Sequence, residues 1–291
     1  MSTTTTLQLT RLRAEQPGLI RVRAQERPRP SSLLGASGRL MVIAADHPAR
    51  GALGAGADPL AMADRQDLLG RLVAALARPG VNGFLGTADL VEDLLLLGAL
   101  DGKVVFGSMN RGGIAGTSFE IDDRFTGYDA ASIEASGMDG GKMLLRIDPD
   151  DPLTAPTLEA TSRAVSDLAG RGLVAMVEPF MSLRVDGRLR NDLSPEAVIR
   201  SIAIAAGLGA TSAYTWLKLP VVDRMEAVLA ASTLPTLLLG GEVSADQDLM
   251  FERWRAALAL PTVVGLTVGR SLLYPPDGDV ASAVDTAVSL L

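Results

Sequence analysis

The stretch that decides the fold runs from residue 141 to residue 179 and reads GKMLLRIDPDDPLTAPTLEATSRAVSDLAGRGLVAMVEP. Two short apolar runs in it, Lys142–Ile147 and Leu173–Glu178, have the length and composition of buried strands. Between them lies Pro156–Gly170, in which apolar residues recur at helical spacing. A strand, a helix and a second strand in this order predict a βαβ unit with parallel strands.

Strand-like and helix-like segments alternate eight times along the chain. The predicted strands are Leu40–Ala45, Val81–Gly86, Lys103–Gly107, Lys142–Ile147, Leu173–Glu178, Tyr214–Leu219, Thr236–Leu239 and Val263–Val268. The predicted helices are Pro59–Ala77, Ala88–Leu97, Asp129–Ser136, Pro156–Gly170, Pro195–Gly207, Asp223–Ala231, Ala245–Leu258 and Val280–Leu290. This pattern predicts an α/β fold, a single (β/α)8 TIM barrel over residues 39–291. The alternative is a doubly wound open sheet, although no G-x-G-x-x-G follows the first strand.

Residues 1–38 precede the first strand and form a separate piece. Leu7–Arg29 is rich in arginine and polar residues, and Pro28–Ser32 interrupts it. We expect an N-terminal helical extension that covers the bottom of the barrel or packs on a neighbouring subunit. We also expect a homo-oligomer, because barrels with such an extension often associate.

Composition excludes several classes of protein. The net charge of −7 is opposite to that of a nucleic-acid-binding surface. No cysteine is present and His47 is the only histidine, so thiolate nucleophiles and zinc sites with three imidazoles are excluded. No apolar run reaches the ~18 residues of a membrane span, and Met1–Thr10 lacks the features of a secretory signal. We therefore expect a cytoplasmic protein without membrane association.

Lysine is rare in this chain. Of the 27 lysines and arginines, only Lys103, Lys142 and Lys218 are lysines. Arginine stays protonated, whereas a buried lysine can lose its proton and act as a nucleophile. The positions of these three lysines therefore help to identify a candidate nucleophile.

Lys218 lies near the C-terminal end of a predicted strand, where barrel enzymes place their chemistry. It shares one face of that strand with Tyr214 and Trp216. If this face points inward, an apolar environment and a second cation nearby favour a neutral, nucleophilic amine. The alternative is an ion-pair lysine that faces the outer helices.

Three further strands deliver ionisable residues to the same end. Lys142 shares a strand face with Leu144 and Arg146 and supplies the second cation. Glu178 ends the next strand, and Asp46 with His47 follows the first strand. Glu178 alone could serve a salt bridge or a helix dipole, and Asp46 could cap a turn. Their arrival from four different strands favours a common site.

The last two strands run into Gly240-Gly241 and Gly269-Arg270. In barrels these two loops commonly bind phosphate through backbone N–H groups, which glycine leaves accessible. Arg270 can add a charge-assisted contact. A Gly-Gly pair alone also serves any tight turn, so the prediction depends on both loops together.

The strand ends resemble those of class I, Schiff-base aldolases. The motifs are Ala44-Ala45-Asp46-His47, Gly141-Lys142-Met143-Leu144-Leu145, Met176-Val177-Glu178-Pro179, Leu217-Lys218-Leu219-Pro220, Leu239-Gly240-Gly241 and Val268-Gly269-Arg270. From about Arg39 onward, their order and spacing resemble the branch containing tagatose-1,6-bisphosphate aldolase, sulfosugar-phosphate aldolases and archaeal-type fructose-bisphosphate aldolases.

The resemblance implies a role for each matched residue. Lys218 would be the Schiff-base lysine, Lys142 its cationic neighbour, and Glu178 and Asp46 the acid–base carboxylates. Gly240, Gly241, Gly269 and Arg270 would hold the phosphate of a small-molecule sugar phosphate. No metal or cofactor is then expected, because the imine takes the place of a metal as electron sink.

Two segments depart from the sugar-bisphosphate enzymes: Asn110–Tyr128 and Arg184–Arg190. There the chain is more similar to an actinobacterial branch of deoxyribose-phosphate aldolase-like barrels associated with inositol catabolism. That branch implies 2-deoxy-5-keto-gluconate 6-phosphate as substrate and dihydroxyacetone phosphate and malonate semialdehyde as products. Arginine side chains near the barrel mouth would bind the substrate carboxylate. The alternative is that these arginines are ordinary surface or ion-pair residues. The candidates are the arginines Arg50, Arg111, Arg146 and Arg184, and His47 is a further candidate for substrate binding.

Three other functions stay open at this point. The substrate could be another sugar phosphate, namely tagatose or fructose bisphosphate, a sulfosugar phosphate or deoxyribose phosphate. A thiolase-like acyl transfer would need no imine. A barrel that only binds a sugar phosphate would not need Lys218, Glu178 and Asp46 together.

Overall fold

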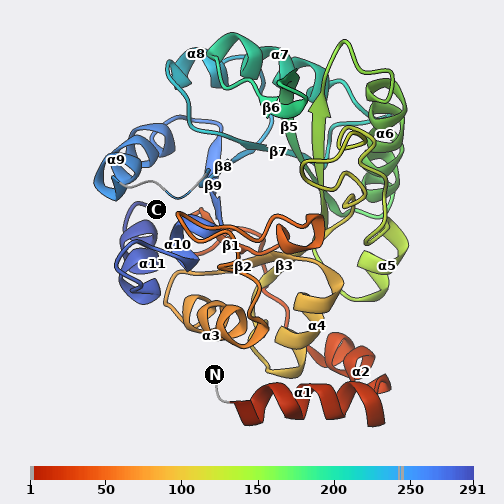
Figure 1. The fold of residues 1–291 in the computed structure, drawn as a ribbon, viewed down its shortest axis with the longest axis vertical. Coiled ribbons are helices and arrows are strands. Elements are labelled where there is room, and N and C mark those ends of the chain that lie inside the picture. The colour runs from red at the N-terminus through yellow and green to blue at the C-terminus, as the bar shows by residue number, and fades with distance from the viewer. Residues whose placement is uncertain (1–2, 242, 244–245) are drawn as a thin grey trace.

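Eight parallel strands close into a barrel with helices outside it (Figure 1), within the residues 3–241, 243 and 246–291 that the computed structural model describes. The barrel strands are β1 (Leu40–Ala44), β2 (Gly83–Gly86), β3 (Val104–Ser108), β4 (Gly140–Ile147), β5 (Val174–Val185), β7 (Thr215–Leu219), β8 (Thr236–Leu239) and β9 (Val263–Val268). Strand β1 pairs with both β2 and β9, and β4 pairs with β5, so the ring is complete. The predicted TIM barrel is confirmed, and the open sheet is excluded.

The helices between the strands match the prediction, with shifted ends. They are α3 (Arg65–Leu76), α4 (Ala88–Leu96), α5 (Ala130–Ala135), α6 (Thr154–Ala169), α7 (Pro195–Ala206), α8 (Met225–Leu229), α9 (Gln247–Leu258) and, after the last strand, α11 (Val280–Val288). The short helix α10 (Arg270–Leu273) is an addition that the sequence analysis does not predict. Helix α3 begins at Arg65 and not near Pro59, because the Asp64 side chain caps it by accepting from the N–H groups of Gln66 and Asp67. Ala245, the first residue of one predicted helix, lies outside the described residues.

Alternating side chains along the strands build two apolar layers. The layer inside the barrel comprises Leu40, Val42, Ala44, Leu85, Val104, Phe106, Val174, Met176 and Leu237. The intervening residues, such as Met41 and Ile43 on β1, pack into the larger layer shared with the helices. A residue two positions beyond an inner-layer residue therefore faces the barrel interior at its C-terminal end.

The N-terminal segment forms two helices, α1 (Thr3–Glu15) and α2 (Gly18–Glu26), which Figure 1 shows at the periphery next to α4. The Arg27 side chain donates hydrogen bonds to the carbonyl oxygens of Leu100, Lys103 and Gly137, just before β3 and β4. Leu33 and Leu34 pack against the inner apolar layer. The segment thus lies at the bottom of the barrel, opposite the C-terminal strand ends.

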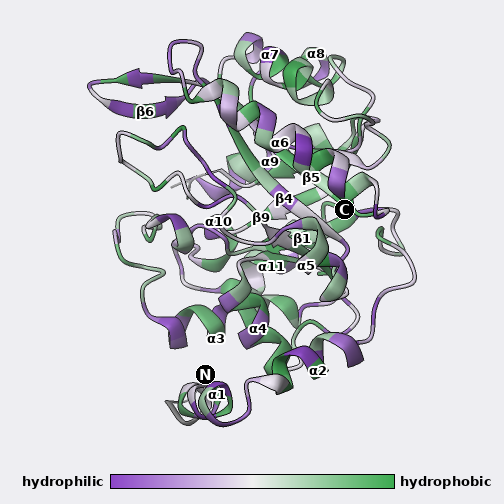
Figure 2. Cartoon of the chain, turned by 90° about the vertical axis from the view of Figure 1, so that its right-hand side faces the viewer, coloured by the Kyte–Doolittle hydropathy of each residue, from purple (hydrophilic) through white to green (hydrophobic). Residues whose placement is uncertain are grey.

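Strand β5 continues beyond the predicted end at Glu178. Its second half pairs with the antiparallel β6 (Arg188–Asn191), which the sequence reading missed. The hairpin projects from the body of the molecule (Figure 2). Asp186 and Gly187 at its turn both have positive φ, which matches the two-residue hairpin turn favoured by Asp-Gly. The arginine-rich run Arg184–Arg190 is therefore a hairpin.

Candidate functional site

Four ionisable side chains meet inside the barrel, above the inner apolar layer. Lys142 comes from β4, Glu178 from β5 and Lys218 from β7, and Asp46 lies two residues beyond the end of β1. None is more than 8% exposed. Lys218 therefore points inward, and it is not the outward-facing lysine of the alternative reading.

Glu178 lies between the two lysines. Its Oε1 is 2.8 Å from Nζ of Lys218, and its Oε2 is 2.5 Å from Nζ of Lys142. Nζ of Lys142 also lies 3.0 Å from Oδ2 of Asp46. The four groups form one continuous chain of ion pairs from β1 to β7.

Asp46 has further partners on its other side. Oδ2 accepts a hydrogen bond from Ser108 at 3.1 Å and lies 3.1 Å from Nη1 of Arg111. Arg111 also donates to the Asp46 carbonyl oxygen at 3.2 Å and to the Asn110 carbonyl oxygen at 2.6 Å. Asn110 in turn exchanges two hydrogen bonds with the backbone of Leu144. The first residues after β3 are thereby fixed against β4.

The ion pairs decide the protonation of the carboxylates. Burial opposes ionisation of Glu178, but Lys142 and Lys218 outweigh it and lower the pKa of Glu178 to about 2. Burial likewise opposes ionisation of Asp46, yet Lys142 and Arg111 hold its pKa well below the ordinary range. Both are carboxylates at neutral pH. The pKa of Lys142 is lowered by burial, against the opposing pull of Asp46 and Glu178.

His47 lies beside the network in its neutral form. Its Nδ1 is 3.7 Å from Oδ1 of Asp46, too far for a hydrogen bond, and is buried without a hydrogen-bond partner. Burial lowers the pKa of His47 to about 3, and the cations Arg270, Lys218 and Lys142 act in the same direction. A neutral imidazole can donate or accept a hydrogen bond here without adding charge.

Of the four candidate arginines, only Arg111 contacts this network. Arg50 and Arg146 both pair with Glu120, a buried residue of the loop after β3. Arg184 pairs with Asp151 at 3.1 Å and donates to the Ser118 carbonyl oxygen. These three arginines form their ion pairs outside the network. Nη2 of Arg111 remains buried without a hydrogen-bond partner.

The glycines of the predicted phosphate loops lie close to backbone and side chains. A Cβ on Gly269 would sit 2.4 Å from the Ala44 carbonyl oxygen, and one on Gly240 would sit 2.7 Å from Oγ of Ser271. Gly241 has a φ of 68°. Nη1 of Arg270 donates to the Gly54 carbonyl oxygen, while its Nε is buried without a hydrogen-bond partner. The loops after β8 and β9 thus approach each other with unpaired polar groups.

Ser108 and Ser271 belong to this region but were missed from the sequence. Ser108 continues the inward alternation of Val104 and Phe106 by one residue beyond the predicted strand, which is the signal that could have found it. Oγ of Ser271 is buried without a hydrogen-bond partner beside Gly240. Ser271 has no comparable signal in the sequence.

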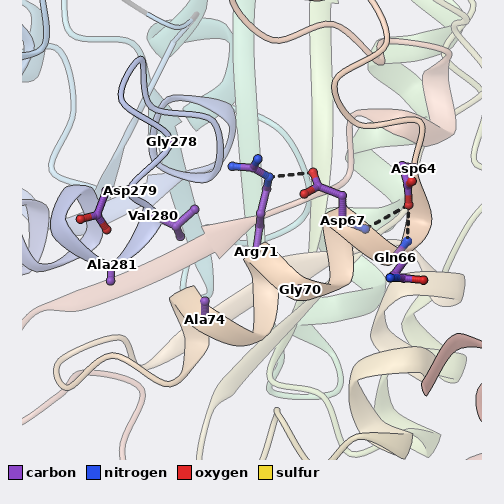
Figure 3. Close-up of a pocket in the computed structure, with 10 residues that line it drawn as sticks. All are labelled: Asp64, Gln66, Asp67, Gly70, Arg71, Ala74, Gly278, Asp279, Val280 and Ala281. Carbon is purple, nitrogen blue, oxygen red and sulfur yellow. Dashed lines mark hydrogen bonds and ion pairs between the residues drawn. The ribbon is translucent and has the colours of Figure 1, made fainter. Parts of the chain in front are cut away.

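A groove of about 540 Å³ lies elsewhere, between α3 and the first turn of α11 (Figure 3). Its acidic residues have structural roles, since Asp64 caps α3 and Asp279 caps α11. None of the ionisable residues of the barrel interior lines it. In the described part of the chain, no three acidic or histidine side chains are grouped as metal ligands. Nor does any described helix have the length and apolarity to cross a bilayer.

Solved structures resemble the chain at two levels. Cgl0159 from Corynebacterium glutamicum is 55% identical, with a TM-score of 0.97 over 100% of this chain and 97% of that one. A Schiff base forming fructose-1,6-bisphosphate aldolase is 17% identical, with a TM-score of 0.65 over 93% of this chain and 99% of that one. An archaeal fructose 1,6-bisphosphate aldolase is 16% identical, with a TM-score of 0.64 over 93% and 98%. The two aldolases share the fold with this chain.

No curated protein matches the chain. The sequence model of one family, described as Cgl0159-like, matches residues 38–288. This range contains the whole barrel and every residue of the ion-pair chain described above. The chain belongs to the Cgl0159-like family.

Proposed function

We propose that this protein is a class I aldolase that cleaves a phosphorylated keto-sugar through a Schiff base on Lys218. The observation that carries the proposal is the position of Lys218, which is buried inside the barrel with Nζ 2.8 Å from Glu178. A second lysine lies on the other oxygen of the same carboxylate. Two amines that share one carboxylate can exchange a proton through it, which leaves Lys218 free to attack a carbonyl carbon.

The reaction begins when Nζ of Lys218 adds to the ketone carbon, and loss of water then gives a protonated imine. A base removes the proton from the hydroxyl group on the second carbon from the imine carbon, and the bond between that carbon and the intervening carbon breaks. The electron pair of that bond passes to the imine and forms an enamine, while the other fragment leaves as an aldehyde. Protonation of the enamine carbon and hydrolysis of the imine release the second product and restore the lysine.

Glu178 is the proposed base, ahead of Asp46. Glu178 contacts Lys218 directly, so its carboxylate lies next to the atom that carries the substrate. Oδ2 of Asp46 is already engaged by Lys142, Arg111 and Ser108. Asp46 is linked to Lys218 only through Lys142 and Glu178, so we assign it the role of holding Lys142.

The proposed phosphate site lies in the loops after β8 and β9. Gly240, Gly241 and Gly269 would offer backbone N–H groups there, and Arg270 would add a charge. The buried Oγ of Ser271 and Nε of Arg270 are two further groups without hydrogen-bond partners at this place. A phosphate group offers several acceptor oxygens for such donors.

For the substrate itself we propose 2-deoxy-5-keto-gluconate 6-phosphate. Its cleavage gives dihydroxyacetone phosphate, which carries the phosphate, and malonate semialdehyde, which carries the carboxylate. Arg111 supports this choice, because a buried guanidinium with an unpaired Nη2 beside the reacting groups suits an anionic tail. Activity in inositol catabolism follows from this substrate and is part of the proposal.

Reduction with borohydride tests the proposal. The protein is incubated with the proposed substrate, fructose 1,6-bisphosphate or tagatose 1,6-bisphosphate, then reduced and digested, while released dihydroxyacetone phosphate is measured in parallel. We expect a mass adduct on the Lys218 peptide, its loss in Lys218→Arg, and unchanged turnover after exhaustive chelation of metals. Lys103→Arg is the matched control, because Lys103 lies at the bottom of the barrel and donates to the Val81 carbonyl oxygen.

Each other outcome contradicts the proposal in a recognisable way. Turnover without any adduct indicates a mechanism without an imine, such as acyl transfer. Binding of the sugar phosphate without cleavage indicates a binding protein. An adduct confined to Lys142 shows that the Schiff base forms on Lys142 and not on Lys218.

A further inference from the structure

The buried network at the barrel mouth contains more basic than acidic groups. Three basic side chains, Lys142, Lys218 and Arg111, face two carboxylates, Asp46 and Glu178. All five are at most 8% exposed. If every group were ionised, one positive charge would remain without a partner among buried side chains. An unpaired buried charge is costly, and such groups commonly lose or gain a proton instead.

The surroundings do not supply the missing negative charge. The adjacent cluster pairs Arg50 and Arg146 with Glu120 and Asp123, two cations with two acids. Burial raises the pKa of Asp123, and the two acids of that cluster do no more than balance its two arginines. On the other side of the network lie Arg270, a cation, and His47, whose imidazole is neutral. The excess of positive charge therefore stays with the network.

Only a lysine can give up the proton. Both carboxylates are held ionised by the adjacent cations. Arginine keeps its proton in proteins. We propose that Arg111 is a positioning residue whose permanent charge on Asp46 keeps one of the two barrel lysines in the unprotonated, nucleophilic form at neutral pH.

The contacts of Arg111 explain why its removal should reverse this state. Nη1 of Arg111 and Nζ of Lys142 lie 3.1 Å and 3.0 Å from the same oxygen, Oδ2 of Asp46. Arg111 thus takes part of the negative charge that would otherwise stabilise the Lys142 ammonium group, and its charge also lowers the pKa of Lys142. Without Arg111, two carboxylates face two lysines, and the network is neutral with both lysines protonated.

The scarcity of lysine allows a direct test without substrate. Lysine labelled with 13C and 15N gives side-chain signals from only Lys103, Lys142 and Lys218, whose shifts report protonation as the pH is raised. We expect one barrel lysine to be largely unprotonated at neutral pH in the unmodified protein. In Arg111→Gln we expect both to be protonated, with the titration moved upward by at least one pH unit, a tenfold change in the amine fraction.

Two further variants secure the interpretation. Asp46→Asn removes a carboxylate and should move the titration in the opposite direction, so the proposal can be judged even if Arg111→Gln fails to fold. Arg184→Gln removes an arginine that pairs outside the network and should leave the lysine titration unchanged. Two fully protonated barrel lysines in the unmodified protein, or an unchanged titration in Arg111→Gln, would overturn the proposal.

The functional significance of this inference rests on the proposed aldolase activity, but the experiment that tests it does not. Lysine titration in the ligand-free protein does not depend on any substrate. If the titration moves as expected and no imine forms with any keto-sugar phosphate, the aldolase proposal fails while the role of Arg111 stands. If imine trapping succeeds and the titration does not move, only the role of Arg111 is wrong.

Discussion

Lys218 and Glu178 form an ion pair inside the barrel, with Nζ of Lys218 2.8 Å from Oε1 of Glu178. The pair joins the inward faces of β5 and β7, which are neighbours in the sheet. A buried ion pair is weak evidence for added stability, because desolvation of two charges offsets their attraction. A chemical role explains better why both groups lie there.

We predict that Glu178→Gln lowers kcat for sugar-phosphate cleavage by about 10²–10⁴-fold, the usual effect of removing a general base. Glutamine retains an oxygen that can accept from a lysine, so the fold should persist. Release of dihydroxyacetone phosphate measures the effect, and borohydride should still trap some substrate on Lys218. Glu196→Gln, which breaks an exposed pair with Arg224, is the control. A turnover rate within a few-fold of the unmodified protein would exclude Glu178 as the base.

We predict that Glu120→Gln mainly reduces stability. Glu120 is the buried partner of both Arg50 and Arg146 and also accepts from the N–H of Gly116. Loss of its charge leaves two buried guanidinium groups that cannot deprotonate, which should lower the free energy of unfolding by about 3–5 kcal/mol. Urea denaturation measures this. If Arg50 or Arg146 instead binds substrate, the variant keeps its stability and loses affinity for substrate.

The matched control for that measurement is Glu159→Gln. Glu159 pairs with Arg163 on α6, but both side chains are largely exposed. Pairs of this kind contribute little, so the change in the free energy of unfolding should stay within about 0.5 kcal/mol. If Glu120→Gln and Glu159→Gln lower the free energy of unfolding equally, the buried cluster contributes no more to stability than an exposed ion pair.

The fold could be predicted because its signals are local. Apolar runs such as Lys142–Ile147 and helical spacing in Pro156–Gly170 identify each element without knowledge of its partners. The same alternation placed Lys218 and Glu178 at the correct end of the barrel. The β5–β6 hairpin was not predicted because the apolar run stops at Glu178-Pro179, although Asp186-Gly187 is a local hairpin signal.

The pairing of the arginines could not be predicted in the same way. Arg50, Arg111, Arg146 and Arg184 look alike in sequence, and their partners lie in loops whose paths depend on tertiary contacts. Glu120 meets Arg146 only because the loop after β3 folds back over β4, where Arg146 also donates to the carbonyl oxygen of Glu120. The same loop brings Arg111 to Asp46, a contact over 65 residues of sequence.

We predict that Gly240→Ala weakens binding of phosphorylated ligands. A Cβ at this position would lie 2.5 Å from Cγ1 of Val268 and 2.7 Å from Oγ of Ser271, so the loops after β8 and β9 must move apart. KM for a sugar phosphate, and the inhibition constant of inorganic phosphate, should rise roughly tenfold, which corresponds to about 1.4 kcal/mol. Gly18→Ala is the control, because no atom lies within 4 Å of its added Cβ. Unchanged constants would place the phosphate elsewhere.

The last prediction concerns acid stability and the single histidine. The folded protein holds His47 neutral, with a pKa of about 3, whereas an unfolded histidine titrates near 6.5. Between these values the unfolded chain binds the extra proton, so stability falls as the pH falls below about 6.5. The limiting slope for one proton is about 1.4 kcal/mol per pH unit, and we expect less because 31% of the His47 side chain is exposed. Urea denaturation at about pH 6.5 and about pH 5 should show this loss in the unmodified protein and little of it in His47→Gln, since carboxylates titrate mainly at lower pH. If both proteins lose stability in parallel over that interval, His47 is not held neutral by the fold.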